Sequence, residues 1–116
     1  MLTIKLTDVN KFDLNLSNER NYYAYEALKG ETHLGLIVFY FKETDCYIEF
    51  IKLEDENDIY LLDGLIRAAG SFSIEKNIET LVFSNISYND KIIEKSLLRE
   101  NKIKLFELFE KSKNCK

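Results

Sequence analysis

An unbroken apolar run across residues 34–41 (LGLIVFYF) is the feature that most constrains how this chain folds. The run follows a glycine turn at Lys29-Gly30 and ends at the polar residues 43–45, so its length is that of one strand. A strand that is apolar at nearly every position has both of its faces covered. The run is also far shorter than the roughly 20 apolar residues of a membrane-spanning helix. We therefore expect residues 32–42 to form a strand of a sheet that is covered on both sides.

Shorter strand signals on both sides of this run predict an antiparallel meander. Residues 2–6 alternate between apolar and polar side chains, residues 22–28 are rich in aromatic residues, and residues 46–53 are again largely apolar. Residues 8–21 are polar and rich in Asn, Asp and Ser, which favours a loop with at most one short helical turn.

A strand–helix–strand unit is predicted after the meander. Asp58, or Asn57 beside it, is a good N-cap, and Asn77 suits the left-handed position that ends a helix. Residues 80–84 (TLVFS) have the length and apolar character of a buried strand, and a helical crossover makes them parallel to residues 46–53. The apolar stripe of the helix consists of Leu62, Leu65, Ile66, Ala69 and Phe72.

The predicted fold is of the α/β (α+β) class: a mixed sheet in which an antiparallel meander is followed by one βαβ unit. The chain has 116 residues and no linker-like stretch, so we expect residues 1–116 to form one domain. Residues 90–98 favour a helix, residues 102–105 favour a strand or more of that helix, and residues 106–112 favour a helical turn or two. The pattern leaves the structure of residues 98–116 open.

Composition narrows the classes of function. The single His33, expected at the surface, and the distant Cys46 and Cys115 supply neither a zinc ligand set nor a disulfide framework, so we expect free thiols and no metal. The net charge of −4 argues against nucleic acid as a partner, because such binding relies on Lys and Arg. No signal-like apolar stretch opens the chain, which predicts a cytoplasmic location and no membrane partner.

The order and spacing of these elements resemble those of the GNAT (N-acetyltransferase) superfamily. The resemblance covers residues 22–90 and rests on Leu34-Gly35-Leu36-Ile37, on residues 46–53, on the helix around residues 63–69 and on residues 79–85. It implies a GNAT-like, acyl-CoA-dependent N-acyltransferase that uses acetyl-CoA, with a small-molecule or peptide amine as acceptor.

The resemblance also implies where the site lies. In the family, acyl-CoA lies where the fourth and fifth strands splay apart, and its pyrophosphate rests on N–H groups at the start of the following helix. By position, Glu49 is implied as the base that takes the amine proton and Tyr88 as the acid that protonates the departing thiolate. The implied cofactor-binding residues are Ile51, Leu53, Asp58, Ile59, Tyr60 and Asn85.

The chain departs from the family pattern in the loop before that helix. Residues 53–60 (LEDENDIY) contain four carboxylates and no Gly, Arg or Lys, where the family has Arg or Gln followed by glycines. Two unit charges about 6 Å apart repel by about 3 kcal/mol at a dielectric of about 20, more than the about 1 kcal/mol of a helix dipole. Either the carboxylates point away, or CoA binds weakly or in another pose. Helix capping explains the same residues without any ligand.

A second departure concerns the acceptor side. The family usually has two helices where residues 8–21 leave room for one at most, so the acceptor wall is either incomplete or supplied by a second subunit of a homodimer. The alternative to an enzyme is a catalytically silent binding or dimerisation module. The aromatic residues of the meander fit either an apolar ligand pocket or a core: Tyr22, Tyr23, Tyr25, Phe39, Tyr40, Phe41, Tyr47 and Phe50.

Overall fold

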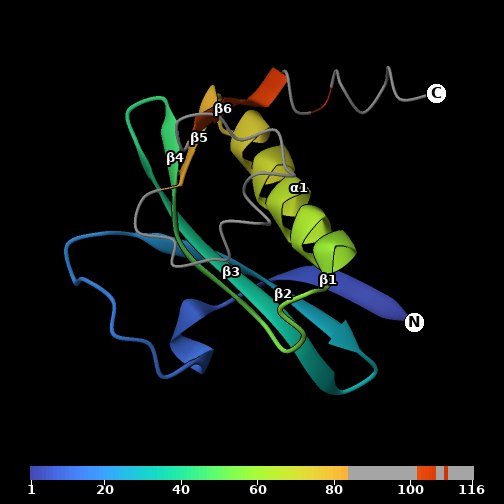
Figure 1. Cartoon of the computed structure of the whole chain (residues 1–116). Coiled ribbons are helices and arrows are strands. Elements are labelled where there is room, and N and C mark those ends of the chain that lie inside the picture. The colour runs from blue at the N-terminus through green and yellow to red at the C-terminus, as the bar shows by residue number, and fades with distance from the viewer. Residues whose placement is uncertain (84–101, 107–108, 110–116) are drawn as a thin grey trace.

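The computed structural model describes residues 1–83, 102–106 and 109, and these residues form one mixed sheet with a helix across it (Figure 1). A short 3-10 helix, η1 (Val9–Lys11), follows the first strand, and helix α1 (Ile59–Glu75) connects the fourth strand to the fifth. The predicted fold class is confirmed. The strands of the described residues lie side by side in chain order: β1 (Leu2–Thr7), β2 (Tyr22–Lys29), β3 (Thr32–Lys42), β4 (Asp45–Leu53), β5 (Thr80–Phe83) and β6 (Lys102–Lys104).

The first four strands form the predicted antiparallel meander, with each strand pairing to the next one in the chain. The turn between β2 and β3 places Gly30 at φ +64°, and the turn between β3 and β4 places Glu43 at φ +58°. Tight hairpin turns use such left-handed residues because they match the twist of the strands. These two turns fix β2, β3 and β4 as neighbours.

The strand–helix–strand unit is also confirmed. β4 and β5 are parallel, and they pair from Asp45 opposite Thr80 to Ile48 opposite Phe83. Asp58 is the N-cap of α1, and Asn77 follows the helix at φ +63°, as predicted. The predicted apolar stripe faces the sheet, with Phe72 half-buried and its other members buried.

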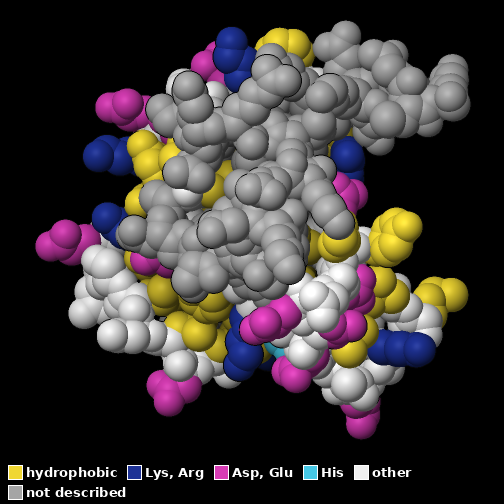
Figure 2. All heavy atoms as spheres, in the orientation of Figure 1, with side chains coloured by type: hydrophobic (Ala, Val, Ile, Leu, Met, Phe, Trp, Pro, Cys, Tyr) yellow, Lys and Arg dark blue, Asp and Glu magenta, His cyan; other side chains and the backbone are white. Residues whose placement is uncertain are grey.

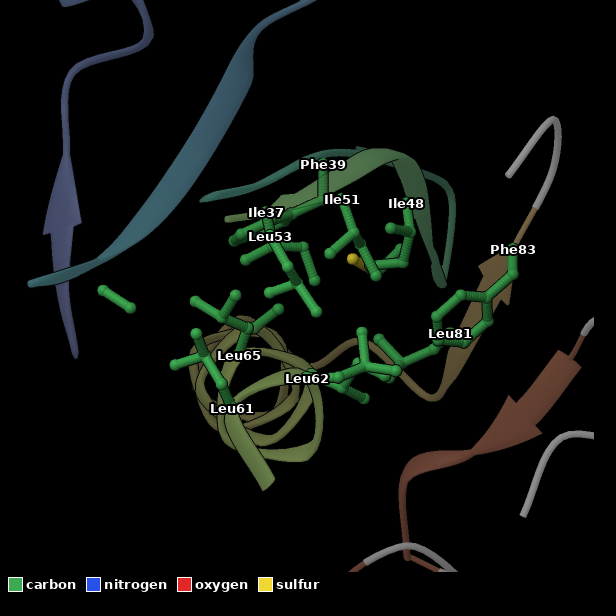
Figure 3. Packing of buried hydrophobic residues seen from close by; sticks show 14 of the residues in the cluster. Ile37, Phe39, Ile48, Ile51, Leu53, Leu61, Leu62, Leu65, Leu81 and Phe83 are labelled. Atoms are coloured by element: carbon green, nitrogen blue, oxygen red, sulfur yellow. The ribbon is translucent and has the colours of Figure 1, made fainter. Parts of the chain in front are cut away.

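The main core lies between α1 and the sheet (Figure 3). Gly35 of β3 permits the close approach, because a Cβ at this position would lie 3.0 Å from Leu53 Cδ2 and 3.1 Å from Leu65 Cδ1. Cys46 is fully buried in this core and is a free thiol. Burial raises the pKa of Cys46 to about 12, against a smaller effect of a hydrogen bond with Ser73, so the thiol is neutral and inert.

The segment between β1 and β2 covers the opposite face of the sheet, away from α1 (Figure 1). Lys11 anchors it, because its Nζ lies 3.2 Å from the buried carboxylate of Glu26. β3 is therefore covered on both faces, as its unbroken apolar sequence predicts. Four apolar residues of the segment pack around Ala24, Leu36 and Val38: Val9, Phe12, Leu14 and Leu16.

His33 is half-buried, contrary to the surface position expected from the sequence. Its Nε2 lies 3.9 Å from Glu26 Oε2 and makes no hydrogen bond with the described residues, and its ring centroid is 5.6 Å from that of Phe12. Burial alone would raise the pKa of Glu26, but hydrogen bonds from Lys11 and Thr7 outweigh burial and hold it below its ordinary value. The sequence did not indicate this contact because β2 and β3 bring its members together.

β6 decides between the two structures expected for residues 102–105, since it is a strand antiparallel to β5. The helix expected over residues 90–98 lies outside the described residues, as does most of the helical turn expected over residues 106–112. Among the described helices, none is long and apolar enough to span a membrane.

Candidate functional site

A β-bulge in β4 shapes the candidate site. Val38 of β3 pairs with Phe50, and the next residue, Phe39, pairs with Ile48, so Glu49 has no partner across the ladder. An extra residue of this kind redirects side chains and is common beside active sites. Ile48 and Ile51 both face α1, whereas Glu49 and Phe50 lie on the opposite face.

On that face Glu49 contacts a tyrosine and an arginine. The hydroxyl of Tyr22 donates to Glu49 Oε1 at 3.3 Å, and Arg20 Nη1 lies 3.9 Å from the same oxygen. The pKa of Arg20 is raised, chiefly by its hydrogen bond with Tyr22. The side chain of Glu49 is 26% exposed, so its carboxylate remains accessible from solvent.

Beyond the bulge, β4 has backbone groups that are unpaired within the part of the chain that the structure describes. Its pairing with β5 ends at Ile48, and in the described residues the rest of β4 pairs with β3 alone. The N–H of Glu54 donates to the carbonyl of Leu34 at 2.9 Å, so these two residues form a hydrogen-bonded pair. Because hydrogen-bonded and non-hydrogen-bonded pairs alternate along an antiparallel ladder, the N–H and C=O groups of Leu53 and Ile51 point away from β3.

The connection from β4 to α1 is acidic, and Figure 2 shows carboxylate side chains gathered around it. Two of its carboxylates are bound to backbone N–H groups: Asp55 accepts from Asn57 at 3.0 Å, and Asp58 accepts from Leu61 at 3.0 Å. Glu54 and Glu56 are exposed. The capping interpretation is therefore confirmed for Asp58, while the two glutamates leave the charge of the loop unbalanced.

The first turn of α1 offers backbone and apolar surface to solvent. The N–H of Ile59 donates to the carbonyl of Asn57 at 2.9 Å, whereas the N–H of Tyr60 finds no acceptor among the described residues. The side chains of Ile59 and Tyr60 are 42% and 91% exposed. A helix start with an uncommitted N–H donor is able to accept an anionic group.

Solved acetyltransferases share the fold of this chain, although no protein-family model and no curated protein matches the sequence. The ribosomal-protein-S18-alanine N-acetyltransferase from Escherichia coli superimposes with a TM-score of 0.64 at 13% identity, over 94% of this chain and 76% of that one. An IAA acetyltransferase from Bacillus cereus superimposes with a TM-score of 0.63 at 16% identity, over 82% of this chain and 75% of that one. A Bacillus subtilis acetyltransferase in complex with CoA superimposes with a TM-score of 0.59 at 16% identity, over 82% of this chain and 74% of that one. The chain has the GNAT N-acetyltransferase fold.

Within the GNAT fold, the predicted cofactor-binding residues of the described chain lie in one region. Asp58, Ile59 and Tyr60 form the start of α1, which a short connection from residue 54 joins to the part of β4 that pairs with β3 alone among the described residues. The side chains of Ile51 and Leu53 are only 7% and 5% exposed and belong to the core, so these residues face the region through their backbone alone.

The predicted base, Glu49, is not brought together with this region. Glu49 lies on the face of the GNAT sheet opposite α1. Asn85 and Tyr88 lie outside the described residues.

Sequence reasoning missed Arg20 and treated the aromatic residues of the meander as one group. The structure divides them between the two faces of the sheet. Tyr22 lies opposite Tyr40 in the ladder, which lies opposite Tyr47, and these three face away from α1. The other face carries an aromatic cluster around Phe72: Tyr23, Tyr25, Phe39 and Phe41.

Proposed function

We propose that this chain is an acyl-CoA-dependent N-acyltransferase that transfers an acyl group, most simply acetyl, to an amine. The observation that carries the proposal is the position of the outward-facing backbone of Ile51 and Leu53 on the GNAT fold, immediately before the start of α1. The CoA complex of the Bacillus subtilis acetyltransferase supports a CoA-type ligand for this fold.

The start of α1 fits a pyrophosphate through its backbone more than through its side chains. The N–H of Tyr60 has no acceptor among the described residues, and a helix N-terminus favours negative charge. Asp55 and Asp58 already accept backbone N–H groups, so they have a role apart from any ligand. Glu54 and Glu56 oppose anion binding, and the affinity for CoA is expected to reflect that opposition.

Two side chains of the protein, Glu49 and Tyr88, are proposed to accept and donate the protons of the reaction. When bound, acetyl-CoA supplies an acyl group that is activated as a thioester. Glu49 would then accept the proton of the amine nitrogen, and Tyr88 would donate a proton to the departing thiolate. Both contacts of Glu49 involve Oε1, which leaves Oε2 for the amine. Asn85 is proposed to hydrogen-bond the cofactor or substrate.

Thermal melting with millimolar acetyl-CoA or CoA tests the proposal. A ligand that binds only the native state stabilises it by about 2.7 kcal/mol at 100 times its Kd. We expect a rise of several degrees in melting temperature, and mass spectrometry of a panel of amines incubated with acetyl-CoA should reveal an acetylated product. An unchanged melting temperature at millimolar ligand would remove the proposal.

A second candidate function is that of a dimerisation module, and the observation that favours it is the edge strand β1. Leu2 and Leu6 of β1 are each 49% exposed, and an unpaired strand edge is a template for another strand. Sedimentation analysis should then give a dimer that Leu6→Lys converts to a monomer. A monomeric wild-type chain at every accessible concentration would exclude this function.

A further inference from the structure

Three tyrosines form a continuous aromatic surface on the face of the sheet away from α1. Tyr22 of β2, Tyr40 of β3 and Tyr47 of β4 are direct cross-strand neighbours. The rings of Tyr40 and Tyr47 stack at 5.2 Å with an interplanar angle of 10°, and Tyr22 meets Tyr40 edge-on at 5.6 Å and 79°. We call these three residues the tyrosine ladder. Its ring faces carry the negative part of the aromatic quadrupole, which attracts cations.

The bulge in β4 adds a carboxylate to this surface. Glu49 is held at the ladder by the hydroxyl of Tyr22 at 3.3 Å. An aromatic surface beside a carboxylate combines the two groups that recognise an organic cation, since the rings accept its apolar and cationic parts and the carboxylate accepts its N–H groups. A neutral or anionic ligand lacks both the attraction of a cation to the rings and the charge-assisted hydrogen bond to the carboxylate.

A cation of the chain itself already lies there. The guanidinium carbon of Arg20 is 4.4 Å from the centroid of the Tyr40 ring, and Nη1 is 3.9 Å from Glu49. Arg20 belongs to the irregular segment between β1 and β2, and its side chain is 46% exposed. Exposed ion pairs of this kind are weak, so another cation is able to displace it. Arg20 and Tyr22 also line a groove of about 560 Å³ that is formed chiefly by that segment and leads away from the ladder, which provides room for the rest of a ligand.

We propose that Tyr22, Tyr40, Tyr47 and Glu49 form a binding site for a primary alkylammonium group, and that Arg20 occupies this site in the free chain. As an acyl acceptor site, it rests on the proposed function, because the bound ammonium would pass a proton to Glu49 before its nitrogen lone pair attacks the acyl carbon. As a binding site it stands without the cofactor, because every contact that defines it lies within the described residues.

Binding without cofactor tests the proposal directly. Pentylammonium and its neutral analogue pentanol are titrated into the protein while the ring signals of the tyrosines are followed by NMR. We expect pentylammonium to shift the signals of the tyrosine ladder and pentanol to leave them unchanged. Arg20→Gln should bind pentylammonium about tenfold more tightly, as when an internal competitor occupies about nine-tenths of the sites. Arg20→Lys, which keeps a cation, should remain close to the wild type.

Two further variants complete the test. Glu49→Gln in the Arg20→Gln background should abolish the preference for pentylammonium over pentanol. Lys76→Gln is the matched control, because Lys76 also lies over an aromatic ring, that of Phe72 at 5.4 Å, but on the other side of the molecule from Glu49. It should leave pentylammonium binding unchanged.

The outcomes separate this proposal from the proposed function. If Arg20→Gln gains no affinity, or pentanol binds as well as pentylammonium, the site is overturned and Arg20 only fastens its segment to the sheet. If the site binds pentylammonium but the chain binds no CoA, the site stands and the acyltransferase proposal fails.

Discussion

The hydroxyl of Tyr22 lies 3.3 Å from Glu49 Oε1, although β3 lies between the strands β2 and β4 that carry these two residues. This contact depends on the bulge, because Glu49 is the one residue of β4 at that point with no partner on β3. The bulge thereby places a half-buried carboxylate on the face of the sheet that α1 leaves free, and it does so at the end of the pairing between β4 and β5.

Glu49→Gln is predicted to lower the rate of acyl transfer by about 10²–10⁴-fold, the usual contribution of a general base. The melting temperature should change little, because Gln keeps an oxygen that accepts the hydrogen bond of Tyr22. Steady-state kinetics and thermal melting check both parts. Glu31→Gln, at an exposed turn, is the control and should leave the rate unchanged. Full activity in Glu49→Gln would exclude Glu49 as the base.

Neutralising the two exposed glutamates of the β4–α1 connection is predicted to strengthen CoA binding. The double variant Glu54→Gln, Glu56→Gln removes charge near the proposed pyrophosphate position without touching the backbone contacts of Asp55 and Asp58. We expect about fivefold tighter binding in low salt and a smaller gain in high salt, because salt screens exposed charges. Calorimetric titration at two ionic strengths measures this. Equal affinity of variant and wild type would show that CoA does not approach this loop.

Cys46 is predicted to make the stability fall at alkaline pH. Its pKa is raised from 9.0 to about 12 by burial, so the folded chain holds the proton while the unfolded chain releases it. The contribution of the protonated Cys46 thiol to the free energy of unfolding is therefore complete below pH 9 and is lost as the pH rises towards 12. Urea unfolding across this range should show a steeper decline for the wild type than for Cys46→Ala. Parallel declines would place the alkaline sensitivity in other groups.

Gly35→Ala and Gly64→Ala form a matched pair. A Cβ at Gly35 would meet Leu53, Leu65 and the carbonyl of Lys52 at 3.0–3.2 Å, so overpacking should cost about 1–3 kcal/mol. A Cβ at Gly64 would meet only the end of the Ile4 side chain at 2.9 Å, which is able to move, and Ala favours the helix by about 1 kcal/mol. Chemical denaturation should thus show a loss for Gly35→Ala and little change for Gly64→Ala. The reverse order would contradict the packing of α1 on β3.

The strands and the helix could be predicted because local signals agree with the tertiary structure. The strand predicted over residues 32–42 has the bounds of β3, Asp58 caps the helix, and Asn77 follows it in the left-handed region. Each of these features depends on residues that are close in the chain, where periodicity, capping and turn preferences act.

The candidate site was less predictable because it depends on register. Apolar core positions in β4 are Cys46 and Ile48, then Ile51 and Leu53, and the gap of three between Ile48 and Ile51 is the one local sign of the bulge. The contact of Arg20 with Tyr40 has no local sign at all, since it depends on the register of β2 and β3, which places Tyr40 opposite Tyr22. The hydrogen bond that Asp55 accepts from the N–H of Asn57 likewise follows from the path of the loop.

Binding of CoA to the backbone of β4 and of the start of α1 is tested most directly by titrating CoA into ¹⁵N-labelled protein and following the amide signals. Saturable shifts should concentrate at Ile51, Leu53, Ile59 and Tyr60, whose N–H groups face outwards from β4 or begin α1. Tyr60→Pro, which removes the uncommitted N–H donor within the first turn of the helix, where Pro is tolerated, should weaken binding, whereas Tyr60→Ala should not. Shifts confined to other parts of the chain, or none at millimolar CoA, would contradict the proposed cofactor site.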